Sequence, residues 1–144
     1  MSSNSTVGLV DTNILILRSD LDVAFLPATM AVSTISIGEL AAGVQAVVGD
    51  SPEAIETRAV RLDHLQRTEY EFDPIPYDAR AAHAFGIIHA AVRSYGRNPR
   101  RRVADLMIAA TARANGLSLF TTNPRDYQGL DSLLAIHEVP LPLP

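Results

Sequence analysis

Short β-type runs alternate with longer helical patterns along this chain, and that order constrains the fold more than any other feature. Apolar and β-branched runs predict strands at residues 7–10, 31–35, 117–121 and 134–139, and a proline-broken edge strand at Phe72–Pro76. Helical spacing and start signals predict helices from Ser36 to about Val48 and over Ser51–Glu71, Asp78–Tyr95 and Val103–Asn115. Such alternation favours an α/β fold with a parallel sheet between two layers of helices.

Length and composition favour one domain spanning residues 1–144. The 47% of hydrophobic residues suffice for a sizeable core, yet no apolar run is long enough for a membrane span. The polar start lacks the basic-then-apolar order of a signal peptide, and the absence of cysteine excludes disulfides, thiolate zinc sites and cysteine nucleophiles. We therefore expect a cytoplasmic protein without membrane association.

All 12 basic residues are arginine, and the net charge is −4. The acidic balance argues against a general nucleic-acid coat protein. The absence of lysine excludes the usual forms of P-loop nucleotidases, pyridoxal-phosphate enzymes and response-regulator receivers, since each uses a lysine in its site.

Acidic and amide side chains follow the predicted strands. Asp11 comes directly after the first strand, Glu39 lies just beyond the second, and Asn123 and Asp126 follow the strand at 117–121. Asp105 belongs to the helix that leads into that last strand. Because ligand sites in open parallel sheets lie outside the carboxyl ends of the strands, we expect these side chains to converge.

Each acid also has a purely structural interpretation. Asp11 is a good helix N-cap, and Ser36-Ile-Gly-Glu39 matches a capping box, in which the glutamate bonds back to the first backbone N–H. Asp105 is harder to explain in this way because it interrupts an apolar helical surface. An ionised carboxylate is seldom fully buried unless it is paired or bound to a metal.

The combination of three acids predicts a metal site. Carboxylates held together raise one another's pKa, and a divalent cation removes that penalty. Hard oxygen ligands suit Mg²⁺ or Mn²⁺, and such a cation can activate water against a phosphodiester.

Four motifs occur in order and at fitting spacing: Leu9-Val-Asp-Thr-Asn13, Ser36-x-x-Glu39-Leu40, Ala104-Asp-x-x-Ile-Ala-Ala-Thr-Ala112 and Thr121-x-Asn-Pro-x-Asp-Tyr127. Together they resemble the PIN-domain ribonucleases, most closely the toxins of VapBC toxin–antitoxin pairs, over nearly the whole chain. The resemblance implies a three-layer sandwich whose central parallel sheet has four or five strands. It also implies a toxin endoribonuclease in which Asp11, Glu39 and Asp105 bind Mg²⁺ or Mn²⁺. Its expected partners are RNA, a VapB-type antitoxin that blocks the active site, and a second copy of the chain.

The chain departs from this pattern at one position. Many PIN proteins carry a fourth acid after the strand matching Leu117–Thr121, whereas the nearest residue here is Asn123, with Asp126 three residues later. We expect both side chains to act from outside the metal's direct ligands. Thr12 and Asn13 either take a similar outer role or only shape the turn after Asp11.

Five arginines fall between residues 93 and 102 without an intervening acid. One interpretation is a patch formed by Arg97, Arg100, Arg101 and Arg102 that contacts RNA phosphates beside the acidic site. The other is a solvated loop that complements the end of the preceding helix dipole.

Two other functions fit the sequence less well. A PIN-like scaffold could bind RNA or a partner without cutting, and the neutral Asn123 is its main support. A phosphatase of the haloacid-dehalogenase type also places an acid after its first strand. That family expects a second aspartate two residues later, where this chain has Asn13, and a lysine that this chain lacks.

Overall fold

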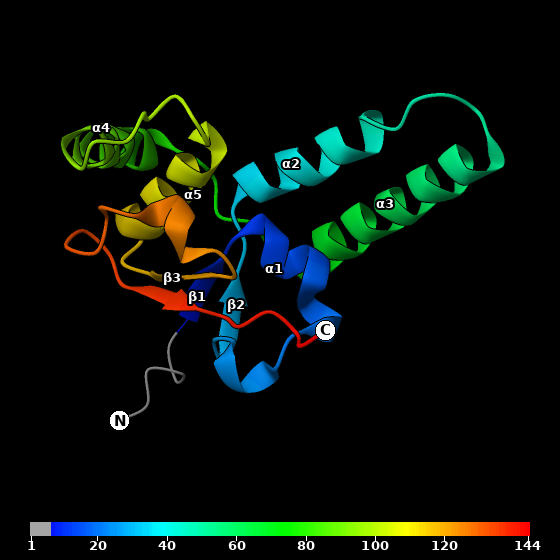
Figure 1. Ribbon diagram of the computed structural model, residues 1–144, viewed down its shortest axis with the longest axis horizontal. Helices are drawn as coiled ribbons and strands as arrows, with labels where there is room; N and C mark the ends of the chain where they lie inside the picture. The colour runs from blue at the N-terminus through cyan, green and yellow to red at the C-terminus, as the bar shows by residue number, and fades with distance from the viewer. Residues whose placement is uncertain (1–6) are drawn as a thin grey trace.

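The computed structural model describes residues 7–144, so the polar start that bears on the signal-peptide prediction lies outside the described residues. One sheet has the strand order β2-β1-β3-β4, and all its neighbouring strands are parallel. The strands are β1 (Val7–Val10), β2 (Thr29–Ala31), β3 (Ser118–Thr121) and β4 (Ile136–Glu138). The predicted parallel α/β sheet is confirmed, with four strands (Figure 1).

Helices cover both faces of the sheet. The α-helices are α1 (Thr12–Leu17), α2 (Thr34–Gln45), α3 (Pro52–Glu71), α4 (Ala79–Ser94) and α5 (Val103–Ala114). Short 3₁₀ segments follow at η2 (Arg18–Asp20), η3 (Val23–Phe25) and η4 (Pro124–Tyr127). Within residues 7–144, no helix combines the length and the apolar composition that a membrane span requires.

Alternating side chains of the two central strands build the two cores. Leu9 pairs in register with Leu119, and both pack with buried residues of α4 and α5. Val10 pairs with Phe120, and both pack instead with residues of α1, α2 and the 21–32 segment. Because successive strand residues point to opposite faces, these two neighbouring pairs each anchor one core, and the sheet lies between two layers of helices.

The start of α2 differs from the prediction. Ser33 accepts a hydrogen bond from the Ser36 N–H (3.2 Å) and caps a helix that begins at Thr34. β2 accordingly ends at Ala31 instead of reaching Ile35. The capping box from Ser36 to Glu39 was therefore wrong, and Glu39 has no capping role at this helix start.

The predicted edge strand at Phe72–Pro76 is reduced to one parallel bridge between Ser33 and Ile75. Ile75 donates to the Val32 carbonyl (2.8 Å) and accepts from the Thr34 N–H (2.9 Å). Pro74 and Pro76 lack the N–H groups that would extend this ladder. Residues 140–144 form no helix or strand, as expected for a chain alternating proline and leucine.

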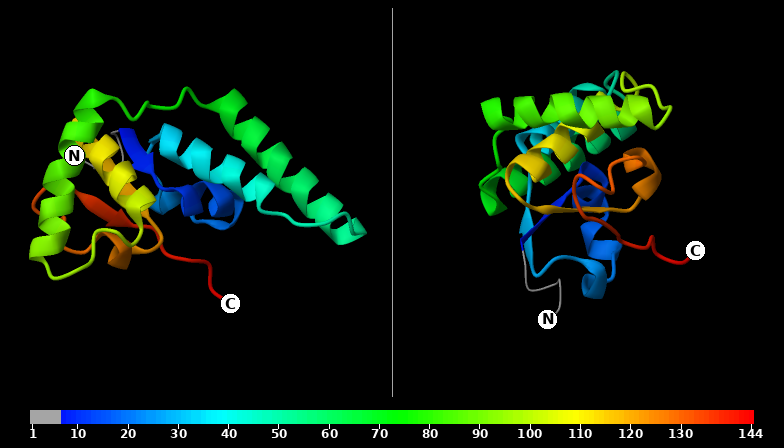
Figure 2. Two further views of the ribbon diagram at one scale, coloured as in Figure 1. Left: turned by 90° about the horizontal axis from the view of Figure 1, so that it is seen from above. Right: turned by 90° about the vertical axis from the view of Figure 1, so that its left-hand side faces the viewer.

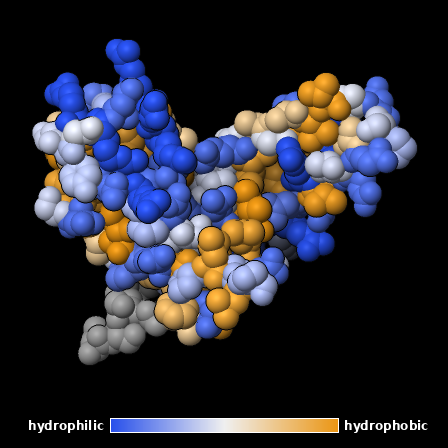
Figure 3. All heavy atoms as spheres, in the orientation of Figure 1, coloured by the Kyte–Doolittle hydropathy of each residue, from blue (hydrophilic) through white to orange (hydrophobic). Residues whose placement is uncertain are grey.

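The hairpin of α2 and α3 extends away from the sheet as an arm, while α4 and α5 lie at the opposite end (Figures 1 and 2). The arm exposes apolar side chains, among them Ile55 and Val60. Figure 3 shows hydrophobic residues on the arm and below its base, and hydrophilic residues over the end that carries α4. The arm therefore carries apolar side chains that are exposed to solvent.

Candidate active site

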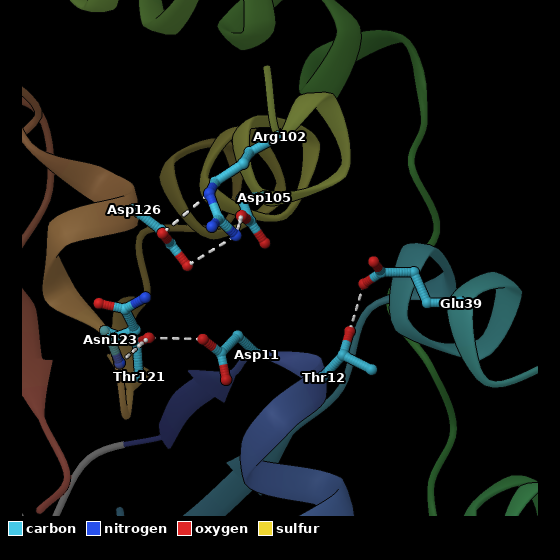
Figure 4. Close-up of polar contacts among 8 residues, drawn as sticks. All are labelled: Asp11, Thr12, Glu39, Arg102, Asp105, Thr121, Asn123 and Asp126. Carbon is cyan, nitrogen blue, oxygen red and sulfur yellow. Dashed lines mark hydrogen bonds and ion pairs between the residues drawn. The ribbon is translucent and has the colours of Figure 1, made fainter. Parts of the chain in front are cut away.

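Four carboxylates from four elements surround one space beside the carboxyl ends of β1 and β3 (Figure 4). Asp11 follows β1, Glu39 lies in α2, Asp105 lies in the first turn of α5, and Asp126 lies in η4. Because α5 leads back into the parallel strand β3, its first turn lies at the strands' carboxyl edge. The convergence expected from the sequence is therefore present.

Asp11 is buried, with 6% of its surface exposed, and both of its carboxylate oxygens accept hydrogen bonds. The Ile14 N–H donates to Oδ1 (3.2 Å), which caps α1. The Thr121 hydroxyl donates to Oδ2 (2.5 Å) and itself accepts from the Asn123 N–H (3.0 Å). Asp11 is thus both a helix cap and a member of the acidic cluster, and Thr121 orients it.

Glu39 lies on the exposed side of the cluster. Its Oε1 accepts from the Thr12 hydroxyl (2.5 Å), and Thr12 also shares a hydrogen bond with Ser36 (2.9 Å). Thr12 therefore takes a supporting position beside Glu39. Asn13 is exposed on α1, and among residues 7–144 its side chain makes no hydrogen bond to the cluster.

Asp105 and Asp126 are joined by Arg102. The Arg102 Nε lies 3.0 Å from Asp126 Oδ1, and its Nη1 lies 3.8 Å from Asp105 Oδ2. The side chains of Asp105 and Asp126 are only 21% and 15% exposed. Asn123 precedes η4, where its side chain makes no capping hydrogen bond.

The carboxylates raise one another's pKa values. Burial, helped by the charges of Asp126, Glu39 and Asp11 and opposed by Arg102, raises the pKa of Asp105 to about 6. Burial also raises the pKa of Asp11, although its hydrogen bonds from Thr121 and Ile14 oppose that rise. Negative charge is therefore concentrated here beyond what protein groups neutralise.

Tyr127 of η4 is a buried residue on which the charges of the cluster act. It is fully buried, and its hydroxyl has no hydrogen-bond partner within residues 7–144. Burial raises its pKa well above the ordinary tyrosine value, and the charges of all four cluster acids raise it further. The hydroxyl is therefore a neutral donor close to the acids.

The donor set suits a hard divalent cation, because carboxylate oxygens are the preferred ligands of Mg²⁺ and Mn²⁺ and mutual repulsion favours a cation. As the side chains stand, no three His, Asp or Glu groups of residues 7–144 are assembled closely enough to hold one ion. Asp11 is turned toward Thr121 and Glu39 toward Thr12. The residues fit a cation in kind, and closure around it requires side-chain rotation.

The family profile of the PIN domain matches residues 8–131, a range that includes every acid of the cluster. The chain belongs to the PIN-domain family. A relative from Mycobacterium tuberculosis, Ribonuclease VapC5, is 29% identical over 139 residues, which cover 94% of this chain and 96% of the relative.

Solved structures share the PIN fold over nearly the whole chain. VapBC-5 from Mycobacterium tuberculosis, of the VapBC family of toxin-antitoxin systems, superposes with a TM-score of 0.76 at 27% identity, covering 94% of this chain and 98% of that one. VapBC2 from Rickettsia felis, bound to a promoter DNA fragment, gives 0.69 at 19% identity, covering 92% and 98%. FitAcB from Neisseria gonorrhoeae gives 0.69 at 22% identity, covering 92% and 97%. The last two support the fold alone.

The arginine stretch of this PIN domain divides into two parts. Arg102 contacts the cluster, whereas Arg97, Arg100 and Arg101 lie in the loop before α5 and make no ion pair with the described acids. The loop is held by Asn98, which accepts from the Arg100 and Arg101 N–H groups. Arg102 therefore differs from the other three in its contacts, and RNA contact by the four arginines stays a prediction.

Proposed function

We propose that this PIN domain is a Mg²⁺- or Mn²⁺-dependent endoribonuclease that acts as the toxin of a toxin–antitoxin pair. The observation that carries the proposal is the set of carboxylates that four separate elements bring to one edge of the sheet. The relative named Ribonuclease VapC5, which matches this chain along nearly its full length, supports RNA as the substrate class. The structural likeness to VapBC-5 supports the toxin role.

In this proposal Asp11, Glu39 and Asp105 hold the cation. A bound divalent cation would activate water and neutralise charge on the phosphodiester. Thr121 fixes Asp11 in place, and Thr12 holds Glu39 on the opposite side of the cluster. The raised pKa of Asp105 means that its charge destabilises the folded protein, a penalty that a bound cation would relieve.

The test is RNA cleavage by the purified chain in Mg²⁺, in Mn²⁺ and in excess chelator. We expect internal cleavage with either metal, none in chelator, and recovery when metal is restored. Cleavage that persists in chelator contradicts metal dependence. RNA binding without cleavage under every metal condition favours the alternative of a non-catalytic PIN-like scaffold.

We further propose two protein partners, a VapB-type antitoxin and a second copy of the chain. The likeness to the VapBC-5 structure supports the antitoxin. A ribonuclease toxin also needs an inhibitor, since it would otherwise degrade RNA in its own cell. Exposed apolar side chains support both contacts, including Ile16 of α1 (55% exposed) and Val60 of α3 (63% exposed).

Light scattering tests the second-copy contact. We expect the mass of a homodimer at micromolar concentration, twice the 15.5 kDa of one chain. A monomer across the micromolar range contradicts this prediction and leaves the antitoxin as the only partner proposed for the exposed apolar surface.

A further inference from the structure

Arg102 holds Asp126 at two points. Besides the 3.0 Å approach of Nε to Oδ1, the Nη1 group donates to Oδ2 of Asp126 at 3.4 Å. Figure 4 shows the guanidinium between Asp126 and Asp105. A two-point contact fixes the plane of a guanidinium as well as its position. Both oxygens of Asp126 are therefore engaged by the arginine.

The backbone at Arg102 is unusual. Its φ of 57° and ψ of 44° are left-handed, and among residues 7–144 it is the one residue other than glycine with a positive φ. A residue with a Cβ disfavours this conformation, and such strain persists only where the surroundings hold it. The residue precedes α5 without making a side-chain cap. The strained backbone therefore occurs at the residue whose guanidinium contacts the acids.

The guanidinium still has donors to offer. The Arg102 side chain is 56% exposed, and its Nη2 makes no hydrogen bond within the described chain. Within residues 7–144, Arg102 is the basic residue that forms ion pairs with acids of the cluster. RNA is a polyanion approaching four carboxylates, so a fixed cation at their edge is where a phosphate would be received.

We propose that Arg102 binds a non-bridging oxygen of the scissile phosphate through Nη2 and so acts as a catalytic residue. Asp126 is its positioning residue and does not ligate the metal. This inference rests on the proposed nuclease function and assigns the part of the site that faces the substrate. It also accounts for the departure at Asn123, since the nearby acid acts through the arginine.

A double-mutant cycle tests the proposal, with kcat, KM and Mn²⁺ activation measured on RNA for each variant. Arg102→Gln is expected to lower kcat by about 100-fold, the scale for losing one preorganised donor. Asp126→Asn is expected to lower it by about 10–100-fold, the scale for an orienting partner. The double variant should be no slower than Arg102→Gln alone, because the two residues act as one unit. Arg102→Lys, which keeps the charge but loses the planar fork, should recover little.

The metal should bind equally well to these variants. We expect an unchanged Mn²⁺ concentration for half-maximal activity and an unchanged rise in melting temperature on adding Mn²⁺. The matched control is the exposed Arg67–Asp63 pair of α3, whose side chains lie 2.9 Å apart. Arg67→Gln, Asp63→Asn and their double variant should cleave like the wild type.

Four outcomes overturn the proposal and leave the nuclease function standing. A weakened Mn²⁺ response in Asp126→Asn alone makes Asp126 a metal ligand. An Arg102→Gln variant that cleaves faster than the wild type would show that the arginine blocks the acidic site. A change confined to KM and to the salt dependence of binding, as we expect for Arg100→Gln and Arg101→Gln, places Arg102 with the general RNA contacts. A loss of kcat in the double variant equal to the product of the two single losses would show that the two residues act independently. A wild type that does not cleave with either metal overturns the nuclease function itself, and this inference with it.

Discussion

Asp105→Asn is expected to abolish RNA cleavage and at the same time to stabilise the metal-free protein at pH 7. Burial and three neighbouring acids raise the pKa of Asp105 from 3.8 to about 6. A carboxyl whose pKa is higher in the folded chain destabilises the fold when it ionises, so the penalty is complete above about pH 6 and absent below about pH 4. Removing the charge should therefore raise the free energy of unfolding at pH 7 by about 1–3 kcal/mol.

Urea unfolding in chelator at pH 7 and pH 4 measures this effect. The difference between Asp105→Asn and wild type should be positive at pH 7 and close to zero at pH 4. Asp50→Asn, at an exposed carboxylate outside the cluster, serves as the control and should change neither value by more than a few tenths of a kcal/mol. Destabilisation at pH 7, or an equal gain at both pH values, contradicts the electrostatic interpretation.

Asp11→Asn is expected to eliminate cleavage without unfolding the protein. Asparagine caps helices as well as aspartate does, and its side-chain oxygen can still accept from the Ile14 N–H or the Thr121 hydroxyl. The substitution thus removes a negative charge and little else. Without that charge, the rise in melting temperature that Mn²⁺ gives the wild type should also be lost.

Expression in cells gives a second measurement. Wild type should arrest growth and degrade RNA, whereas Asp11→Asn should do neither. Asp22→Asn is a matched control, because Asp22 also caps a short helix through its carboxylate but lies outside the cluster. Growth arrest by Asp11→Asn at equal protein levels would show that the toxicity does not come from this site.

The sequence predicted the parallel sheet correctly, but it did not predict where β2 ends and α2 begins. Apolar runs separated by helical patterns require a parallel sheet, whatever their exact ends. The end of β2 was missed because Val32, Thr34 and Ile35 are β-branched and favour a strand. Ser33 and Ser36 both suit a helix start. The deciding interaction is the Ser33 cap, a choice between two equivalent signals that only the folded backbone makes.

The site was predictable where it depends on topology. Asp11, Glu39 and Asp105 follow from the rule that strand ends converge, and the structure brings their side chains around one space. Thr121 was missed as the partner of Asp11, since nothing in its sequence context distinguishes it from other strand threonines. The Arg102–Asp126 contact depends on a left-handed backbone at an arginine, where glycine or asparagine would have been the local signal.

The projecting arm has a mechanical consequence. Glu39 belongs to α2, so one acid of the site is carried by the hairpin while the others belong to the body. The hairpin is tied to the body where Ile75 bonds to Val32 and Thr34, close to both of its ends. Glu39 lies in α2 between this tie and the tip around Gly49, so a tilt of the hairpin about the tie would displace Glu39 together with the tip, by a smaller distance. A partner that binds at the tip and tilts the hairpin would thus change the distance between Glu39 and Asp11, although it contacts neither residue.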